Sequence, residues 1–298
     1  MEIITLLQNS LPVLTALSFV LGLLVGSFLN VVVYRLPIML QREWKAQCCE
    51  YLEIENTEPD SNEGSAKFSK FNLQTPDSHC PNCNRKIRPW ENIPVISYLV
   101  LGGKCAGCKS KISLRYPGVE FVTGLMSALV AYTFGAEWLT LALLVFTWCL
   151  ISMTLIDFDH QLLPDNITIP LLWLGLLVNA LDLGFGVSAA DALLGAVIGY
   201  LSLWSFYWLF KLATGKEGMG YGDFKLLAAL GAWMGWQSLL PIIILSSLGG
   251  AVFGIAMIIL TARDRSQPMP FGPFLAGAGF IMLVWGQNIT SLYLRAFT

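Results

Sequence analysis

The sequence predicts an all-α polytopic membrane protein, with about eight transmembrane helices and a cytoplasmic, zinc-ribbon-like loop domain. Composition is the first reason: 55% of the 298 residues are hydrophobic, 13% are charged, and the mean hydropathy is +0.62. A soluble domain carries about 25% charged residues. The other reasons are a succession of long apolar runs and two CxxC pairs in the one long polar segment. The composition therefore excludes an ordinary soluble domain.

The apolar runs predict the membrane helices, since crossing the hydrocarbon core takes about 20 apolar residues. The first run, from Leu11 to about Tyr34, is too long for a signal-peptide core and follows no basic region, so we expect it to be retained. The sixth is short and rich in glycine. We predict helices near residues 12–34, 117–135, 138–156, 167–182, 190–211, 223–237, 239–261 and 271–293.

The basic residues predict the orientation. All of the 18 Lys and Arg residues except Arg295 fall in or beside the loops after the first, fifth and seventh predicted helices. The positive-inside rule then places these loops in the cytoplasm and both termini outside.

Three regions follow from this topology. Residues 1–34 are the first transmembrane helix, 35–116 are a cytoplasmic loop domain, and 117–298 are a seven-helix membrane domain. Within the loop domain, residues 41–78 are polar and acidic, and we expect them to form a mobile insertion. Its acidic residues include Glu53, Glu55, Glu58, Asp60 and Glu63.

The two CxxC pairs predict a metal site. Cys80 and Cys83 are separated by 21 residues from Cys105 and Cys108, a spacing that suits a tetrahedral zinc ion. Four thiolate ligands leave no open coordination position, so the role would be structural. The alternative is a set of free or redox-active thiols.

Acidic residues at the membrane edge predict a catalytic site, because charge at membrane depth is costly. Asp157 opens the run Asp157-Phe158-Asp159-His160, and Asp223 ends Gly220-Tyr221-Gly222-Asp223; both lie at the predicted cytoplasmic edge. Two such carboxyl groups can act as general base and general acid on a water molecule. Alternatively, Asp165 and Asp223 cap helix N-termini, and Asp159 and His160 are solvated.

Together these residues resemble bacterial prepilin peptidases (type IV leader peptidases), which are membrane aspartyl proteases of the GxGD class. The resemblance covers nearly the whole chain and follows the family's order of motifs. It includes Gly26-Ser27-Phe28-Leu29-Asn30, Tyr34-Arg35-Leu36-Pro37, both CxxC pairs, Asn92-Ile93-Pro94, Arg115-Tyr116-Pro117, Val119-Glu120, the 157–165 segment and Gly220-Tyr221-Gly222-Asp223.

The resemblance implies a fold, a reaction and a location. Family members lie in the bacterial inner membrane and cut the basic leader from type IV prepilins and pseudopilins on the cytoplasmic side. Many then N-methylate the new terminal residue with S-adenosylmethionine. The resemblance assigns catalysis to Asp157 and Asp223, structural zinc to the four cysteines, and methyl transfer to Gly103 and Lys104. The stretch 41–78 is longer than the family's core motifs require.

Other functions stay open at this point. Within the enzyme class, two alternatives remain: a prepilin peptidase that does not transfer methyl groups, and an intramembrane protease similar to signal peptide peptidase. A transporter would use the aspartates as proton or cation ligands, although they lie at helix ends. A non-enzymatic scaffold would use the zinc-bound loop to dock partners. No GxGxxG nucleotide fingerprint is present, and we expect protein substrates and lipid, not nucleic acid, as partners.

Overall fold

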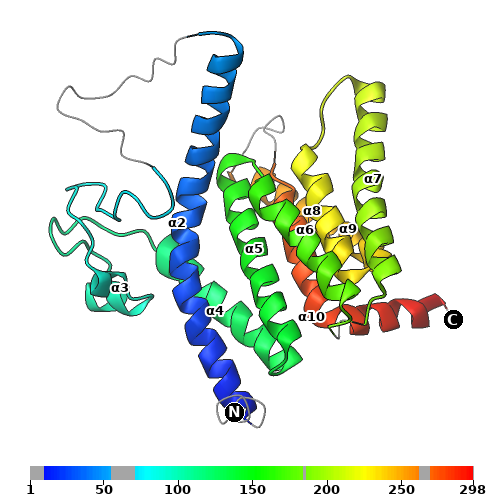
Figure 1. Cartoon of the computed structure of the whole chain (residues 1–298), viewed down its shortest axis with the longest axis horizontal. Coiled ribbons are helices and arrows are strands. Elements are labelled where there is room, and N and C mark those ends of the chain that lie inside the picture. Colours follow the sequence, from blue (N-terminus) through cyan, green and yellow to red (C-terminus); the bar gives the residue numbers. More distant parts are fainter. Residues whose placement is uncertain (1–9, 55–70, 184–185, 262–268, 298) are drawn as a thin grey trace. The chain divides into compact units, whose positions relative to one another are not determined.

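The structure is a computed structural model that describes residues 10–54, 71–183, 186–261 and 269–297, with side chains up to residue 289. Helices form the whole of the regular structure in these ranges, and the only β pairing there is two isolated bridges, which confirms the all-α class (Figure 1). The elements are α2 (Leu11–Tyr51), the 3₁₀ helix η1 (Pro89–Asn92), α3 (Ile96–Val100), α4 (Arg115–Phe134), α5 (Trp138–His160), α6 (Asp165–Ala180), α7 (Ala189–Thr214), α8 (Tyr221–Met234), the 3₁₀ helix η2 (Trp236–Ser238), α9 (Leu239–Thr261) and α10 (Gly272–Phe297).

Each predicted apolar stretch coincides with one of these helices. Among the described residues, five helical segments are long and apolar enough to cross a membrane: α2, α4, α5, α7 and the segment 236–260. Helix α6 is apolar but has only 16 residues, and α8 has 14. The chain is thus a multi-pass membrane protein with at least these five candidate spans.

Helix α2 is longer than the sequence predicted. It continues through Pro37 and ends at Tyr51, whereas the prediction stopped near residue 34. The first part of the predicted acidic insertion, residues 41–51, is therefore helical. The acidic residues Glu55, Glu58, Asp60 and Glu63 lie outside the described residues, as do the basic residues Arg263 and Arg265.

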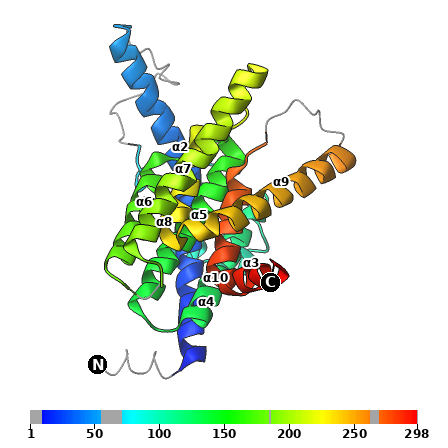
Figure 2. The same cartoon turned by 90° about the vertical axis from the view of Figure 1, so that its right-hand side faces the viewer.

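The chain divides into two compact units, residues 1–19 with 125–298, and residues 20–124. In the first unit, α8 is the central helix: it packs against α6, α7 and α10, and nearly all of its residues from Asp223 onward are buried (Figures 1 and 2). Glycine allows the close approach of α7, since a Cβ on Gly199 would lie 2.7 Å from the Leu227 carbonyl oxygen. Helix α9 extends away from this group in Figure 2.

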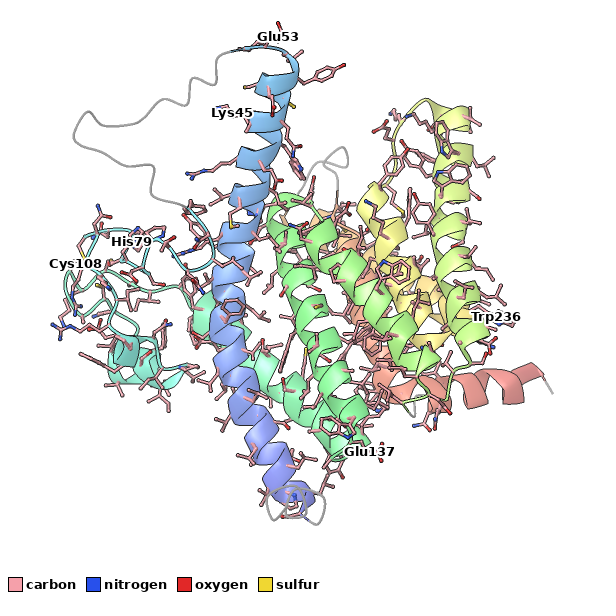
Figure 3. The ribbon with its side chains drawn as sticks, viewed as in Figure 1. Lys45, Glu53, His79, Cys108, Glu137 and Trp236 are labelled. Atoms are coloured by element: carbon pink, nitrogen blue, oxygen red, sulfur yellow. The ribbon has the colours of Figure 1, made fainter. Side chains whose placement is uncertain are left out.

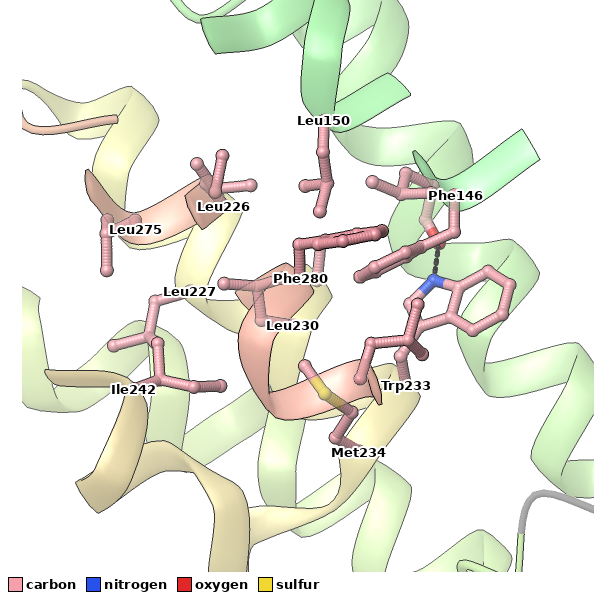
Figure 4. Close-up of a cluster of buried hydrophobic side chains, with 14 of the residues drawn as sticks. Phe146, Leu150, Leu226, Leu227, Leu230, Trp233, Met234, Ile242, Leu275 and Phe280 are labelled. Carbon is pink, nitrogen blue, oxygen red and sulfur yellow. Dashed lines mark hydrogen bonds between the residues drawn. The ribbon is translucent and has the colours of Figure 1, made fainter. Parts of the chain in front are cut away.

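Polar bonds fix α8 along its axis. The Trp233 indole donates to the Leu171 carbonyl of α6 at 2.9 Å, within a cluster of buried side chains from α5, α8, α9 and α10 (Figure 4). The Asn179 amide donates to the carbonyls of Ala232 and Trp233 at 2.8 and 3.1 Å. These carbonyls are in the last turn of α8, where no intrahelical donor remains. The position of Asp223 is thereby set from the far end of its helix.

In the second unit, short hydrogen-bonded loops replace a large core. Helices α2 and α4 meet where a Cβ on Gly26 would lie 2.7 Å from the Glu120 Cα. The buried Arg35 guanidinium donates to the carbonyls of Asn72, Leu73 and Pro76, at 3.0, 3.3 and 2.6 Å. One side chain thus anchors the start of the loop that carries the first CxxC pair.

Candidate active site and metal centre

Asp157 lies in the last turn of α5, which ends because Gln161 adopts φ 52° and ψ 44°. The carboxyl group is buried, with 6% of the residue exposed. Its Oδ2 accepts a hydrogen bond of 3.0 Å from the backbone N–H of Gly272, at the start of α10. Two helices distant in sequence therefore meet at this carboxyl group.

Asp223 is the third residue of α8, whose N-cap is Gly220. It is also 6% exposed, and its carboxyl group accepts from the Gly220 backbone N–H. Its Oδ1 is buried and has no partner among the described residues. Buried polar atoms are nearly always hydrogen-bonded, so this oxygen is available to a water molecule or a substrate group.

Leu163 brings the two aspartates together. A Cβ on Gly222 would lie 2.7 Å from Leu163 Cβ, and a Cβ on Gly272 would lie 3.1 Å from Leu163 Cδ2 and 2.6 Å from Asp157 Oδ2. One leucine thus touches the residue beside Asp223 and the residue bonded to Asp157. The two carboxyl groups are close enough to interact electrostatically. Only glycine fits at either contact.

A partly exposed ion pair also joins the start of α6 to α8. Lys225 Nζ lies 2.7 Å from both carboxylate oxygens of Asp165. Asp165 is the first residue of α6, after the N-cap Pro164, and its side chain binds Lys225. Asp223 is the third residue of α8 and accepts from the backbone N–H of the N-cap Gly220, so the capping alternative stays compatible with the geometry for Asp223. Asp159 and His160 are exposed, as the alternative of solvated side chains expects.

The loop before α8 is held by a second ion pair. Lys211 donates to Glu217 at 2.7 Å and to the Tyr207 hydroxyl at 3.2 Å. The Lys211 ammonium keeps the pKa of the Glu217 carboxyl below its usual value. Tyr207 in turn packs its ring against Tyr221 and Phe224 of α8. This arrangement fixes the glycine-rich turn that delivers Asp223.

The four cysteines come together as the sequence predicted. The Sγ atoms of Cys80, Cys83, Cys105 and Cys108 all lie within 4.8 Å of one another, and those of Cys80 and Cys108 are 3.8 Å apart. Figure 3 labels Cys108 and the neighbouring His79. Zinc–sulfur bonds of about 2.3 Å place tetrahedral sulfurs about 3.8 Å apart. The cluster therefore has the size of a zinc site. Free thiols would not need to lie at these distances.

The two CxxC loops have the same backbone. The N–H of Cys80 donates to Arg85 O at 2.9 Å, and the N–H of Cys105 donates to Ser110 O at 2.9 Å. The residue after each second cysteine, Asn84 or Lys109, has a positive φ, 52° or 59°. An isolated β-bridge closes each loop, His79 with Lys86 and Lys104 with Lys111. Each loop contributes two thiols in the same geometry.

Donors around Cys108 favour its thiolate form. The Ser110 hydroxyl lies 3.1 Å and the Asn82 amide 3.5 Å from Cys108 Sγ, and together they lower the pKa of that thiol to about 5. The Gly107 N–H donates to Cys105 Sγ at 3.4 Å. Metal-binding cysteines bind as thiolates, and outer donors of this kind orient them.

Gly103 and Lys104 enter the second loop. Gly103 is buried with φ 68°, and a Cβ there would lie 2.7 Å from the Tyr98 hydroxyl oxygen. Lys104 is exposed. The structure thus places an exposed ammonium group directly before Cys105, on a backbone turn that only glycine enters easily.

Gly272, Leu163 and Lys225 were missed by the sequence analysis. Gly272 acts through its backbone N–H, and Leu163 acts by packing against Gly222 and Gly272. Neither residue carries a reactive side chain that would mark it in the sequence. The run Pro270-Phe271-Gly272-Pro273, at the entry to an apolar stretch, was the available signal for Gly272. Lys225 follows Asp223 by two residues and could have been paired with an acid of the 157–165 segment.

Comparison with known families matches nearly the whole chain. Residues 20–134 match the model of the bacterial peptidase A24 N-terminal domain, and residues 144–255 match that of the type IV leader peptidase family. The chain is 57% identical to a prepilin leader peptidase/N-methyltransferase of Stutzerimonas stutzeri over 93% of each chain. The protein of that name in Aeromonas hydrophila is 53% identical over 100% of both chains. No solved structure matches.

Proposed function

Because the chain belongs to the type IV leader peptidase family, we propose that Asp157 and Asp223 form its catalytic pair. The protein is a membrane protease that cleaves the leader of type IV prepilins and N-methylates the new terminus; its substrates also include pseudopilins. The observation that carries the catalytic assignment is the convergence of the two buried carboxyl groups on Leu163, with Asp223 Oδ1 left without a partner.

The two carboxyl groups share one proton and act on a water molecule between them. The Gly272 N–H stabilises negative charge on Asp157, which suits the general base. Asp157 takes a proton from the water, whose oxygen attacks the carbonyl carbon of the leader's last residue. Asp223 donates its proton to the carbonyl oxygen. When the carbon–nitrogen bond breaks, the amine leaves with the proton held by Asp157, and Asp223 regains a proton from the new hydroxyl.

Zinc is the metal that the four cysteines would hold. Their thiolates fill a tetrahedral shell, so a bound ion stabilises residues 78–112 and leaves no position for a reactant. Methyl transfer is assigned to Gly103 and Lys104. S-adenosylmethionine would supply the methyl group there, and the exposed Lys104 ammonium suits the carboxylate of that donor.

The proposed topology has eight membrane helices, with α6, α8 and α10 added to the five candidate spans. Short helices can be buried inside a bundle, as α8 is. The basic residues predict that the loop domain and both aspartates face the cytoplasm of a bacterial inner membrane, with the termini outside.

The test follows substrate mass. The purified protein in detergent is incubated with a prepilin and S-adenosylmethionine, beside its Asp157→Asn and Asp223→Asn variants. We expect loss of the leader and gain of one methyl group, with cleavage at least about 100-fold slower in either variant because an acid–base group is gone. Cleavage by either variant at the normal rate would remove that aspartate from the mechanism. Cleavage without methyl gain would reduce the protein to a peptidase.

A further inference from the structure

Glu120 is a buried acid that the cleavage mechanism does not use. It lies in the second turn of α4 with 7% of the residue exposed. Its Oε2 accepts a hydrogen bond of 2.8 Å from the backbone N–H of Val95, and its carboxyl group also accepts from the Ser27 hydroxyl of α2. Gly26 lies directly against the Glu120 Cα. The two helices therefore hold this carboxylate in one place.

The residue that Glu120 binds has an unusual backbone. Val95 has φ 57° and ψ −47°, and the N–H of Ile96 donates to Pro94 O at 2.5 Å. This is a γ-turn of the rare, strained hand. A β-branched residue at positive φ is an outlier, and such strain persists only where the surroundings hold it. The hydrogen bond from the Val95 N–H to Glu120 is the side-chain contact that we take to hold the turn.

The Val95 turn sets the start of α3, and α3 leads to Gly103. Val95 is the N-cap of this five-residue helix, and its carbonyl accepts from Leu99 N at 3.1 Å. The helix ends where the N–H of Gly103 donates to the Tyr98 carbonyl at 2.9 Å. The Tyr98 ring lies against the Gly103 backbone. One short helix thus links the Glu120 carboxylate to the residue before Lys104.

We propose that Glu120 is a positioning residue for methyl transfer: it holds the Val95 turn, and through α3 and Tyr98 it fixes the backbone that presents Gly103 and Lys104. This inference rests on the proposed function and names a further residue for its second reaction. The contacts described for Asp157 and Asp223 come from residues 163, 220 and 272, so the proposal predicts that loss of the Glu120 carboxylate leaves cleavage in place.

The experiment separates the two reactions in the full-length protein in detergent. Cleavage is measured on a prepilin, and methyl transfer on a pilin that already lacks its leader, with S-adenosylmethionine in both tubes. The variants are Glu120→Ala, Glu120→Gln, Val95→Gly and the double variant Glu120→Ala/Val95→Gly. Glycine adopts positive φ without strain, so the double variant can form the turn without the carboxylate.

We expect Glu120→Ala to slow methyl transfer about 10-fold or more, while cleavage stays within about two-fold of the unmodified protein. Glu120→Gln keeps an oxygen that can accept from the Val95 N–H, so it should lose less methyl-transfer activity than Glu120→Ala. Val95→Gly alone remains close to the unmodified protein. The double variant recovers most of the methyl transfer lost in Glu120→Ala, and this rescue distinguishes positioning from a general structural role.

Amide hydrogen exchange gives a readout that does not depend on activity. Glu120→Ala should raise exchange of the Leu99 and Gly103 amides, and the double variant should restore their protection. Three results would overturn the inference: unchanged methyl transfer in Glu120→Ala, equal loss of both reactions, or a double variant no better than Glu120→Ala. An unmodified protein that cleaves without methylating would overturn the methyl-transfer half of the proposed function, and this inference with it.

Discussion

The backbone N–H of Gly272 donates to Asp157 Oδ2 at 3.0 Å, and a side chain on Gly272 would meet that same oxygen. The start of α10 therefore stabilises the carboxylate, and it lies so close to it that no side chain fits at position 272. Among the described residues no side chain donates to this oxygen, so a negative charge there is stabilised by one peptide group.

Replacing Gly272 with alanine tests this contact. The added Cβ would lie 2.6 Å from Asp157 Oδ2 and 3.1 Å from Leu163 Cδ2, so one of them must shift. We expect cleavage about 10- to 100-fold slower, because small displacements of a catalytic group cost this much. The matched control is Gly277→Ala in the same helix, where a Cβ meets nothing within 4 Å. Equal activity in the two variants would contradict the close contact.

Reversing the Lys225–Asp165 pair tests whether it holds the two segments together. Its side chains are 32% and 49% exposed, so solvent screens the pair and it contributes at most about 1 kcal/mol, about five-fold in rate. Lys225→Asp places two acids side by side and should slow cleavage. The double variant Lys225→Asp/Asp165→Lys should recover the rate. A double variant as slow as the single one would show that Lys225 acts in another way.

Metal analysis tests the cysteine cluster. The purified protein should contain about one zinc ion per chain, and Cys108→Ser should lose it. Cobalt(II) in place of zinc should give the absorption of a four-thiolate site. The control is Cys149→Ser, because Cys149 lies in α5 outside the cluster. Zinc retained in Cys108→Ser, or zinc lost in Cys149→Ser, would contradict the assignment.

The Glu217–Lys211 pair predicts a pH dependence in the turn before α8. The folded carboxyl group has its pKa below the usual 4.5, because Lys211 stabilises its charged form. The pair therefore adds stability above about pH 4.5 and loses it as pH falls through the lowered folded pKa. Amide exchange at Gly218 and Gly220 should rise over that range. Glu217→Gln should remove this pH dependence, and an unchanged profile in that variant would exclude the pair as its cause.

Much of the fold could be predicted because each membrane helix requires a long run of apolar residues, which is visible in the sequence. All eight predicted stretches coincide with helices to within a few residues at most ends. The exception is α2, whose predicted end near residue 34 was the end of the apolar run. Proline removes one donor and disfavours the helix, but the residues after it include many good helix formers, and α2 continues for 14 residues to Tyr51.

The candidate site was predictable where chemistry depends on side chains. Carboxylates and thiols are visible in a sequence, and the structure brings Asp157 near Asp223 and gathers the four cysteines. Backbone chemistry is not visible in this way. The Gly272 N–H and the γ-turn at Val95 depend on how distant segments meet, which no local pattern specifies.

At about 1.5 Å per residue, the 41 residues of α2 reach about 60 Å, whereas the hydrocarbon core of a bilayer is about 30 Å thick. About half of this helix must therefore stand in the headgroup region and the water beyond. Membrane helices tilt by about 20° on average, which would carry the far end of such a rod sideways by about 20 Å. Because the tilt of a membrane helix depends on bilayer thickness, a thinner or thicker bilayer would change the tilt of α2 and displace its far end, Tyr51, sideways.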